Sequence, residues 1–128
     1  MQKKCPFCHL PAERILKTTA HSLIIRDGYP ISKGHSLIIP KRHIASLFDA
    51  SIEEQHDLLQ TLTWAKTQLD QQLKADGYNI GINDGETAGQ TVMHLHIHLI
   101  PRYQDDSEDP RGGVRWIFPD KADYWTKN

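Results

Sequence analysis

The chain has 128 residues, which suffice for one hydrophobic core but not for two, and we expect a single domain over residues 1–128. Its 15 Lys and Arg nearly balance its 16 Asp and Glu, and a net charge of -1 excludes the broad positive field that duplex nucleic acid requires. No apolar run approaches the roughly 20 residues of a membrane span, and no apolar leader follows the N-terminal lysines, so we expect a cytoplasmic protein whose partners are small molecules.

Two apolar, β-branched segments near the N-terminus predict a pair of strands. Residues 21–25 and 35–39 share the string His-Ser-Leu-Ile-Ile. The residues between them include Asp-Gly, Pro and Gly, which favour turns. We therefore expect two neighbouring antiparallel strands, the second of which ends at Pro40.

A long amphipathic helix is predicted after a short turn or helical segment at residues 44–48. Ser51 and Glu54 form an S-x-x-E capping box, which is typical of a helix start. Apolar residues then recur every three or four positions and so share one face of the helix: Leu58, Leu62, Ala65, Leu69 and Leu73. We expect Gly77 to stop this helix and one face of a sheet to lie beneath it.

Two further strands and a tail complete the predicted elements. Residues 78–83 and 91–101 alternate in hydropathy as strands do, and the small polar residues 84–90 between them predict a loop. The tail, residues 104–128, begins as an acidic and then glycine-rich segment that we expect to be exposed. Because the strands are grouped before and after one long helix, the predicted fold is α+β with a mainly antiparallel sheet, one long helix and one short helix.

Three histidines alternate with aliphatic residues in the last predicted strand. Successive side chains of a strand point to opposite faces, so His94, His96 and His98 are expected on one face. The other face carries Leu95, Ile97 and Leu99 and must be the buried one. A polar face that is histidine by chance is the alternative, but three histidines in period two favour a functional site.

The strand spacing leaves two uses for these histidines. Alternate residues lie roughly 6.8 Å apart, whereas a zinc ion binds nitrogen at about 2.1 Å, so one ion cannot take all three rings. Two neighbouring rings could hold a catalytic zinc ion. Alternatively, a neutral imidazole could attack phosphorus or a carbonyl carbon as a nucleophile.

Three motifs together resemble the histidine triad (HIT) family. Residues 94–100 match H-φ-H-φ-H-φ-φ, where φ is an apolar residue, and residues 34–44 match G-H-x-L-V/I-I-P-K-x-H. The chain also carries the start Cys5-Pro6-Phe7-Cys8. The resemblance implies a mainly antiparallel five-stranded sheet and a homodimer in which two such sheets join.

The resemblance also implies cleavage of nucleotides at the α-phosphate. It makes His96 the nucleophile that forms a covalent nucleotidyl intermediate, with His98 and His35 as its catalytic partners. The residues it places at the phosphate are Asn83, Gly89, Gln90, Thr91 and His98. It places Asp27 at the ribose hydroxyls, although a turn residue is a nearly equal interpretation of Asp27-Gly28, and it makes Ile25 and Leu10 walls for the base.

The two cysteines have three interpretations: a redox pair, inert thiols, or half of a zinc site. A redox C-x-x-C normally follows a strand and opens a helix, whereas only four residues precede Cys5. HIT proteins with an N-terminal C-x-x-C use the histidine of P-K-x-H and the first triad histidine as further ligands. The resemblance therefore implies a structural zinc ion held by Cys5, Cys8, His43 and His94.

The leading hypothesis for function is a dinucleoside polyphosphate hydrolase. A nucleoside phosphoramidase is the alternative with the same nucleophile. A zinc-stabilised nucleotide-binding protein with weak turnover and a metal-dependent hydrolase are alternatives of other classes. The aromatic and apolar part of the tail matches nothing in the family core, and we expect it either to shape the base pocket or to cover the sheet.

Overall fold

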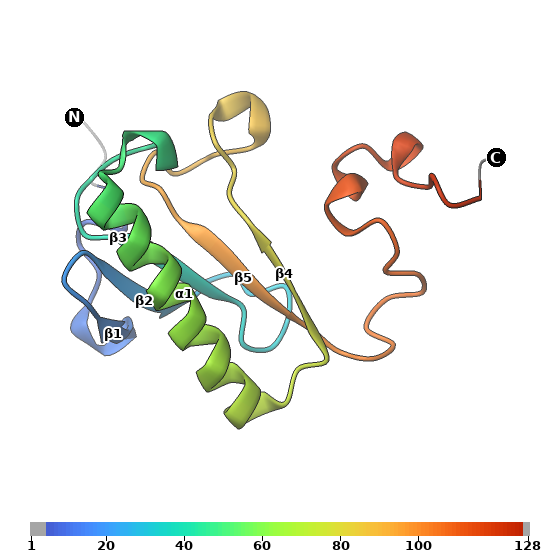
Figure 1. Cartoon of the computed structure of the whole chain (residues 1–128), viewed down its shortest axis with the longest axis horizontal. Coiled ribbons are helices and arrows are strands. Elements are labelled where there is room, and N and C mark those ends of the chain that lie inside the picture. Colours follow the sequence, from blue (N-terminus) through green and yellow to red (C-terminus); the bar gives the residue numbers. More distant parts are fainter. Residues whose placement is uncertain (1–4, 127–128) are drawn as a thin grey trace.

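The computed structural model describes residues 5–126 and contains one antiparallel five-stranded sheet with one long helix, as predicted (Figure 1). The strands lie in the order β1-β2-β3-β5-β4. Their bounds are β1 Ile15–Thr18, β2 Ser22–Arg26, β3 Ser36–Pro40, β4 Gly77–Gly81 and β5 Ile97–Arg102, and the helix is α1 Ile52–Leu73. The expected strands at 21–25 and 35–39 are thus confirmed, and β1 is an additional edge strand.

Helix α1 begins with the predicted capping box but ends earlier than Gly77. Ser51 Oγ accepts a hydrogen bond from Glu54 N, and Glu54 Oε1 accepts one from Ser51 N. The helix ends at Leu73, and Lys74 adopts a left-handed conformation with φ 53°. The early end has a clear cause, since the backbone of β4 is already paired with that of β5 from Gly77 onward.

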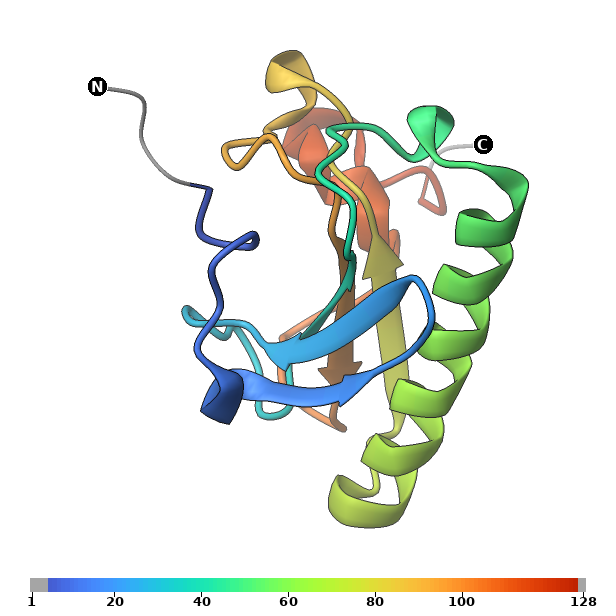
Figure 2. The same cartoon turned by 90° about the vertical axis from the view of Figure 1, so that its left-hand side faces the viewer.

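The sheet is covered on both faces where β2 and β3 pair (Figure 2). Ile24 and Ile38 are buried in the core cluster that contains the apolar face of α1. On the opposite face the N-terminal segment packs against a second buried cluster: Leu23, Ile25, Leu37 and Ile39. Two covered faces explain why the repeated Leu-Ile-Ile is continuously apolar rather than alternating.

Strand β5 is shorter than the predicted strand 91–101. Residues 91–96 run extended or in turns beside the loop that follows β3, where Leu95 N donates to the Ile44 carbonyl oxygen. The buried side chains still alternate: Leu95, Ile97 and Leu99 are all buried. His94 is also fully buried, so the expectation that the three histidines share an open polar face is wrong for the first of them.

Gly34 lies where the loop before β3 meets the last turns of α1. Its φ is +91°, and a Cβ at this position would lie 2.7 Å from Leu73 Cδ1 and 3.0 Å from Leu69 Cδ2. The left-handed backbone and the close approach both require glycine here.

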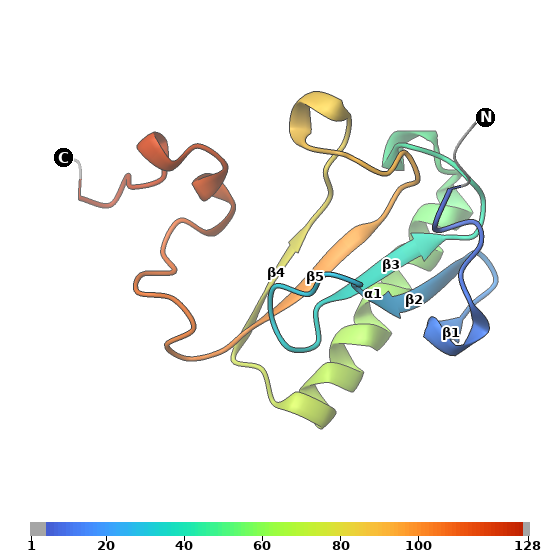
Figure 3. The same ribbon diagram turned by 180° about the vertical axis from the view of Figure 1, so that it is seen from behind.

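The tail leaves the sheet after β5 and lies beyond the edge strand β4 (Figures 1 and 3). It forms two short 3-10 helices, Gly113–Ile117 and Pro119–Lys121. Within residues 5–126, no helix combines the length and the apolar character that a bilayer crossing requires.

Candidate active site and candidate metal centre

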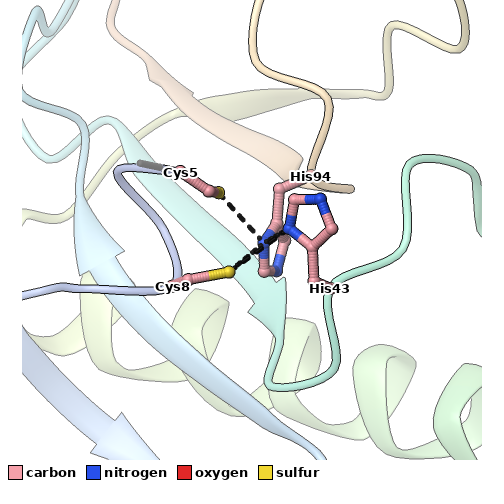
Figure 4. Close-up of side chains that lie close together, drawn as sticks. All are labelled: Cys5, Cys8, His43 and His94. Atoms are coloured by element: carbon pink, nitrogen blue, oxygen red, sulfur yellow. Dashed lines mark hydrogen bonds between the residues drawn. The ribbon is translucent and has the colours of Figure 1, made fainter. Parts of the chain in front are cut away.

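Two cysteines and two histidines from separate parts of the chain converge beside the sheet (Figure 4). Cys5 and Cys8 lie on the N-terminal segment, His43 lies on the loop after β3, and His94 precedes β5. Their Sγ atoms and ring nitrogens all lie within 4.8 Å of one another. The structure thus brings together the four ligands that the sequence predicts for zinc.

The distances between these atoms fit one tetrahedral ion. The Nδ1 atoms of His43 and His94 are 3.1 Å apart, and Cys8 Sγ lies 3.2 Å and 3.5 Å from them. Tetrahedral zinc with bonds of about 2.0–2.3 Å has edges of about 3.3 Å between nitrogens and about 3.6 Å between nitrogen and sulfur. Two thiols and two imidazoles are also a common donor set of closed structural zinc sites, so the residues fit this ion.

His94 has the tautomer that a metal ligand needs. Its Nε2–H donates a hydrogen bond to the backbone oxygen of Pro40 at 2.8 Å, because a carbonyl oxygen can only accept. The lone pair of the neutral ring therefore lies on Nδ1, the atom that faces Cys5, Cys8 and His43. Burial lowers the pKa of His94, which further favours the neutral ring.

His96 has the opposite tautomer. Its Nδ1–H donates to the backbone oxygen of His94 at 2.8 Å, so its Nε2 carries the lone pair that a nucleophile needs. The ring stands between Phe7 and His98, at a centroid distance of 5.1 Å from each. These contacts orient the ring without engaging Nε2.

Phe7 is a contact of this site that the sequence analysis missed. It lies between the two cysteines of the C-x-x-C loop, and its ring meets His94 and His96 nearly edge-on, at centroid distances of 6.0 and 5.1 Å. The sequence did contain one indication, which is the position of Phe7 between Cys5 and Cys8. A side chain flanked by two candidate metal ligands is fixed in place together with them.

His35 and His98 form a directed pair of imidazoles beside His96. The backbone N–H of Ile31 donates to His35 Nδ1 at 3.2 Å, which places the proton of His35 on Nε2. That Nε2 lies 3.0 Å from His98 Nδ1. His98 Nδ1 therefore accepts, and the proton of His98 lies on its Nε2, where it can be donated to a substrate.

Asp27 has a turn role and an electrostatic role. Its Oδ1 accepts from Tyr29 N at 2.8 Å, and its Oδ2 lies 3.3 Å from His35 Nε2 and 3.9 Å from His98 Nδ1. Burial lowers the pKa of both histidines and this carboxylate offsets only part of the effect, so both rings are neutral at pH 7. The ribose contact expected for Asp27 stays a prediction.

The side chains of Asp27, His35 and His98 lie close enough to one another to suggest a second metal site. A metal ion would need the lone pair of His35 on Nε2, which would move its proton to Nδ1. Two donors, this N–H and that of Ile31, would then face each other at 3.2 Å. The geometry therefore opposes the metal-dependent alternative at these residues.

Gln90 shapes the loop that precedes the triad. Its Oε1 accepts from Gly85 N at 2.8 Å, and its Nε2 donates to the backbone oxygens of Ala45 and Val92 at 2.9 and 3.1 Å. Both Nε2 protons are used in these bonds. Gln90 therefore fixes the shape of this loop, and its own amide has no proton left to donate to a phosphate.

The other residues expected at the phosphate lie on the open part of this loop. Asn83 and Thr91 are exposed, and Gly89 has a left-handed φ of 95°. Gly81 pairs with His98 across β4 and β5, which brings the start of the loop beside the triad. Phosphate binding by these residues stays a prediction.

The residues expected to hold the base lie beside the triad, on the face of the sheet away from α1. Leu37 pairs with His98 across β3 and β5 and belongs to the same buried cluster as Ile25. Leu10 packs against this cluster from the N-terminal segment. Ile25 is completely buried, so a base would contact Leu10 before it reached Ile25.

Arg42 and Glu54 form a second contact that the sequence analysis missed. Arg42 Nη2 and Nε donate to the two carboxylate oxygens of Glu54 at 2.7 and 3.1 Å. This paired hydrogen bond lowers the pKa of Glu54 to about 2. It ties the residue before His43 to the start of α1 and so fixes the loop that carries one candidate zinc ligand.

Comparisons with known proteins agree with this geometry. A HIT domain profile matches residues 10–105. Bis(5'-adenosyl)-triphosphatase of Saccharomyces cerevisiae is 35% identical over 120 residues, which are 93% of this chain and 55% of the yeast protein. The chain thus spans about half the length of this relative.

Two solved structures share the fold. A Zn-bound histidine triad family protein from Mycobacterium smegmatis is 35% identical, with a TM-score of 0.73 over 82% of this chain and 79% of that one. Plasmodium falciparum diadenosine triphosphate hydrolase, solved with cyclomarin A, is 29% identical, with a TM-score of 0.74 over 78% of this chain and 68% of that one. The domain match, the identities and the shared fold together show that this chain belongs to the HIT domain family.

Proposed function

We propose that this protein is a nucleotide hydrolase that cleaves dinucleoside polyphosphates at the α-phosphate through a covalent nucleotidyl-histidine. The observation that carries the proposal is the hydrogen bond from His96 Nδ1 to the His94 carbonyl oxygen, which leaves His96 Nε2 as a free nucleophile. The names of the yeast and Plasmodium relatives support the substrate class, since both refer to a diadenosine triphosphate.

The reaction has two displacements at one phosphorus atom. The lone pair of His96 Nε2 attacks the α-phosphorus, and the bond from this phosphorus to the bridging oxygen of the leaving nucleoside phosphate breaks with its electrons on that oxygen. The ring then carries a positive charge, which the His94 carbonyl oxygen stabilises through Nδ1–H. Water next attacks the phosphorus and loses a proton, which releases the nucleotide and restores the neutral ring.

The neighbouring groups support both displacements. His98 donates a hydrogen bond from its Nε2–H to a non-bridging oxygen of the α-phosphate and keeps this proton, and His35 maintains that tautomer by donating to His98 Nδ1. Asn83 and Thr91 supply further donors from the loop before the triad. The N–H of Gly89 is bonded to the Glu86 carbonyl oxygen, so Gly89 shapes this loop rather than donating to the phosphate.

We further propose a structural zinc ion at Cys5, Cys8, His43 and His94. Bound zinc would cross-link the N-terminal segment to the loops flanking β3 and β5. Through Phe7, which stands between the cysteines, this cross-link holds one side of the His96 ring in place. The Zn-bound neighbour from Mycobacterium smegmatis supports the assignment.

A homodimer is proposed from the family resemblance and from one surface of the structure. β4 is an edge strand of the described residues, and its Ile80 and the neighbouring Leu59 of α1 are 55% and 58% exposed. Both side chains line a hollow between α1 and β4. An unpaired strand edge next to exposed apolar side chains is suited to pairing with a second copy of the chain.

The test is mass spectrometry of protein quenched during turnover of diadenosine triphosphate, followed by peptide mapping. An adenylyl group on His96 is the expected result, and its absence from an active enzyme would refute the covalent route. Parallel assays with adenosine phosphoramidates test the phosphoramidase alternative, which predicts that these substrates are hydrolysed in preference to diadenosine triphosphate. Nucleotide binding with negligible hydrolysis of either substrate would instead identify the zinc-stabilised binding protein.

A further inference from the structure

A pocket of roughly 630 Å³ lies between the sheet and the C-terminal tail. His98 and Asn83 line one end of it, so it opens directly beside the triad. It is formed by β4, β5, the loop between β2 and β3, and the first 3-10 helix of the tail. The base site expected near Leu10 and Ile25 lies on strands β1 to β3, on the other side of His98.

The walls of this pocket are largely apolar and incompletely covered. Ile31 comes from the loop between β2 and β3, Ile100 from β5, and Val114 and Ile117 from the tail. Ile31, Val114 and Ile117 are 74%, 70% and 69% exposed. A flat apolar ligand between them would remove this surface from water, which favours binding.

Hydrogen bonds hold the walls in place without any ligand. Tyr103 OH donates to the Lys33 backbone oxygen at 2.7 Å, which fixes the loop between β2 and β3. Arg102 donates to both carboxylate oxygens of Asp106 at 2.8 Å and to Asn79 Oδ1 at 2.7 Å, which fixes the start of the tail against the ends of β4 and β5. Preformed pockets of this size, apolar with a few polar groups, are typical small-molecule sites.

Two polar groups in the pocket are suited to a nucleotide. Ser32 lines the pocket, and its Oγ is buried without a hydrogen-bond partner within residues 5–126, so rotation of this hydroxyl towards a bound ligand would give it the partner that it lacks. Lys33 adds a positive charge at the same wall, which suits a phosphate. The apolar walls suit a nucleobase, so the pocket combines the groups that one nucleoside phosphate requires.

We propose that this pocket binds the leaving nucleoside phosphate, the half of the substrate that is expelled when His96 attacks the α-phosphorus. The inference rests on the proposed function and deepens it, because the tail then selects the substrate class. A dinucleoside polyphosphate fills the pocket with its second nucleoside. A phosphoramidate with a small amine leaves it empty and gains nothing from it.

Kinetics of pocket variants test this assignment. Ile117→Asp and Val114→Asp each place a charge on the wall that the tail contributes, and Phe118→Asp is the matched control, since Phe118 is equally exposed at 69% and adjacent to Ile117 but does not line the pocket. The readout is the ratio of kcat/KM for diadenosine triphosphate to kcat/KM for adenosine 5'-phosphoramidate, two substrates with the same transferred adenylyl group. Both pocket variants should lower this ratio at least about tenfold. The control should keep the wild-type ratio.

A pocket variant that slows both substrates equally, or neither, would overturn the proposal. A binding experiment separates this failure from failure of the proposed function. In protein carrying His96→Ala, diadenosine triphosphate should bind at least about tenfold more tightly than AMP, and adding either pocket substitution should abolish the difference. Equal affinities refute the pocket even in an active enzyme. If the affinities differ as expected but the wild-type protein hydrolyses neither substrate, the hydrolase proposal fails and the pocket assignment stands.

Discussion

His94 and His96 are joined through a single carbonyl group: the His94 backbone oxygen accepts the Nδ1–H of His96 at 2.8 Å, while the His94 ring faces the candidate zinc ligands. The orientation of the proposed nucleophile therefore depends on the backbone position of a proposed metal ligand. The two rings use different tautomers: the lone pair of His94 lies on Nδ1 and that of His96 on Nε2.

Removal of zinc should destabilise the fold, because the bound ion would cross-link the N-terminal segment to the loops that carry His43 and His94. We expect about one zinc ion per chain, and we expect Cys5→Ser with Cys8→Ser to abolish zinc binding and lower the melting temperature. Elemental analysis and thermal unfolding with and without a chelator measure both effects. Full zinc content in the double variant would exclude the assigned ligands.

Replacement of the triad histidines should separate their roles. His96→Ala should eliminate the adenylyl adduct and reduce turnover to background, whereas His98→Ala should retain the route and lose about 10²- to 10³-fold in rate, as expected for a lost hydrogen-bond donor to the phosphate. Rapid-quench assays with adduct detection distinguish the two variants. An adduct that persists in His96→Ala would assign the nucleophile to another residue.

Loss of the Arg42–Glu54 pair should destabilise the protein. Glu54→Ala removes the capping box and the paired hydrogen bond together, and we expect a loss of about 1–3 kcal/mol in the free energy of unfolding. Because the pKa of Glu54 is lowered from 4.5 to about 2, its contribution is present above pH 4.5 and disappears as the pH falls towards 2. Urea unfolding at several pH values measures it, with exposed Glu53→Ala as the control.

The buried histidines should make stability fall on mild acidification. His35 and His98 have pKa values below the ordinary 6.5, so the unfolded chain binds more protons than the folded chain once the pH falls through 6.5. The free energy of unfolding should therefore decrease from pH 7.5 to 5.5. Replacing both by Asn should flatten this slope, and exposed His56→Asn should leave it unchanged. An unaltered slope in the double variant would contradict the assignment.

Dimer formation should depend on the β4 edge rather than on the β1 edge. Ile80→Lys and Leu59→Lys should shift the chain towards monomer, because each buries a charge in the proposed interface. Leu16→Lys on β1 is the matched control, since Leu16 is 47% exposed on the opposite edge strand. Light scattering over a range of concentrations reports the mass. A wild-type chain that is monomeric throughout would refute the dimer.

The parts of the fold that follow hydropathy were predictable from sequence, and the parts set by tertiary pairing were not. β2, β3 and the start of α1 carry strong local signals. β1 does not, because Leu16 is exposed while Lys17 is half-buried and lies over the Trp64 ring at 4.6 Å. The end of α1 also depends on a distant partner, since the pairing of β4 with β5 takes the chain away from the helix.

The candidate site shows the same division. The resemblance predicted the four candidate zinc ligands, which the structure brings together, and the candidate catalytic histidines, because these residues stand in motifs. It could not reveal that the backbone N–H of Ile31 sets the tautomer of His35, since any residue supplies that group. Nor could it show that Gln90 donates both amide protons to backbone oxygens, those of Ala45 and Val92.

Gly34 couples the position of helix α1 to that of the candidate catalytic residue His35. It precedes His35 directly, and the space for its missing side chain is filled by Leu69 and Leu73 of α1. The last two turns of the helix therefore limit how closely the loop that carries His35 can approach α1. A substitution that enlarges or repacks these two leucines will move the His35–His98 pair as well as the core, so stability and the alignment of the candidate site cannot be tuned independently at this end of α1.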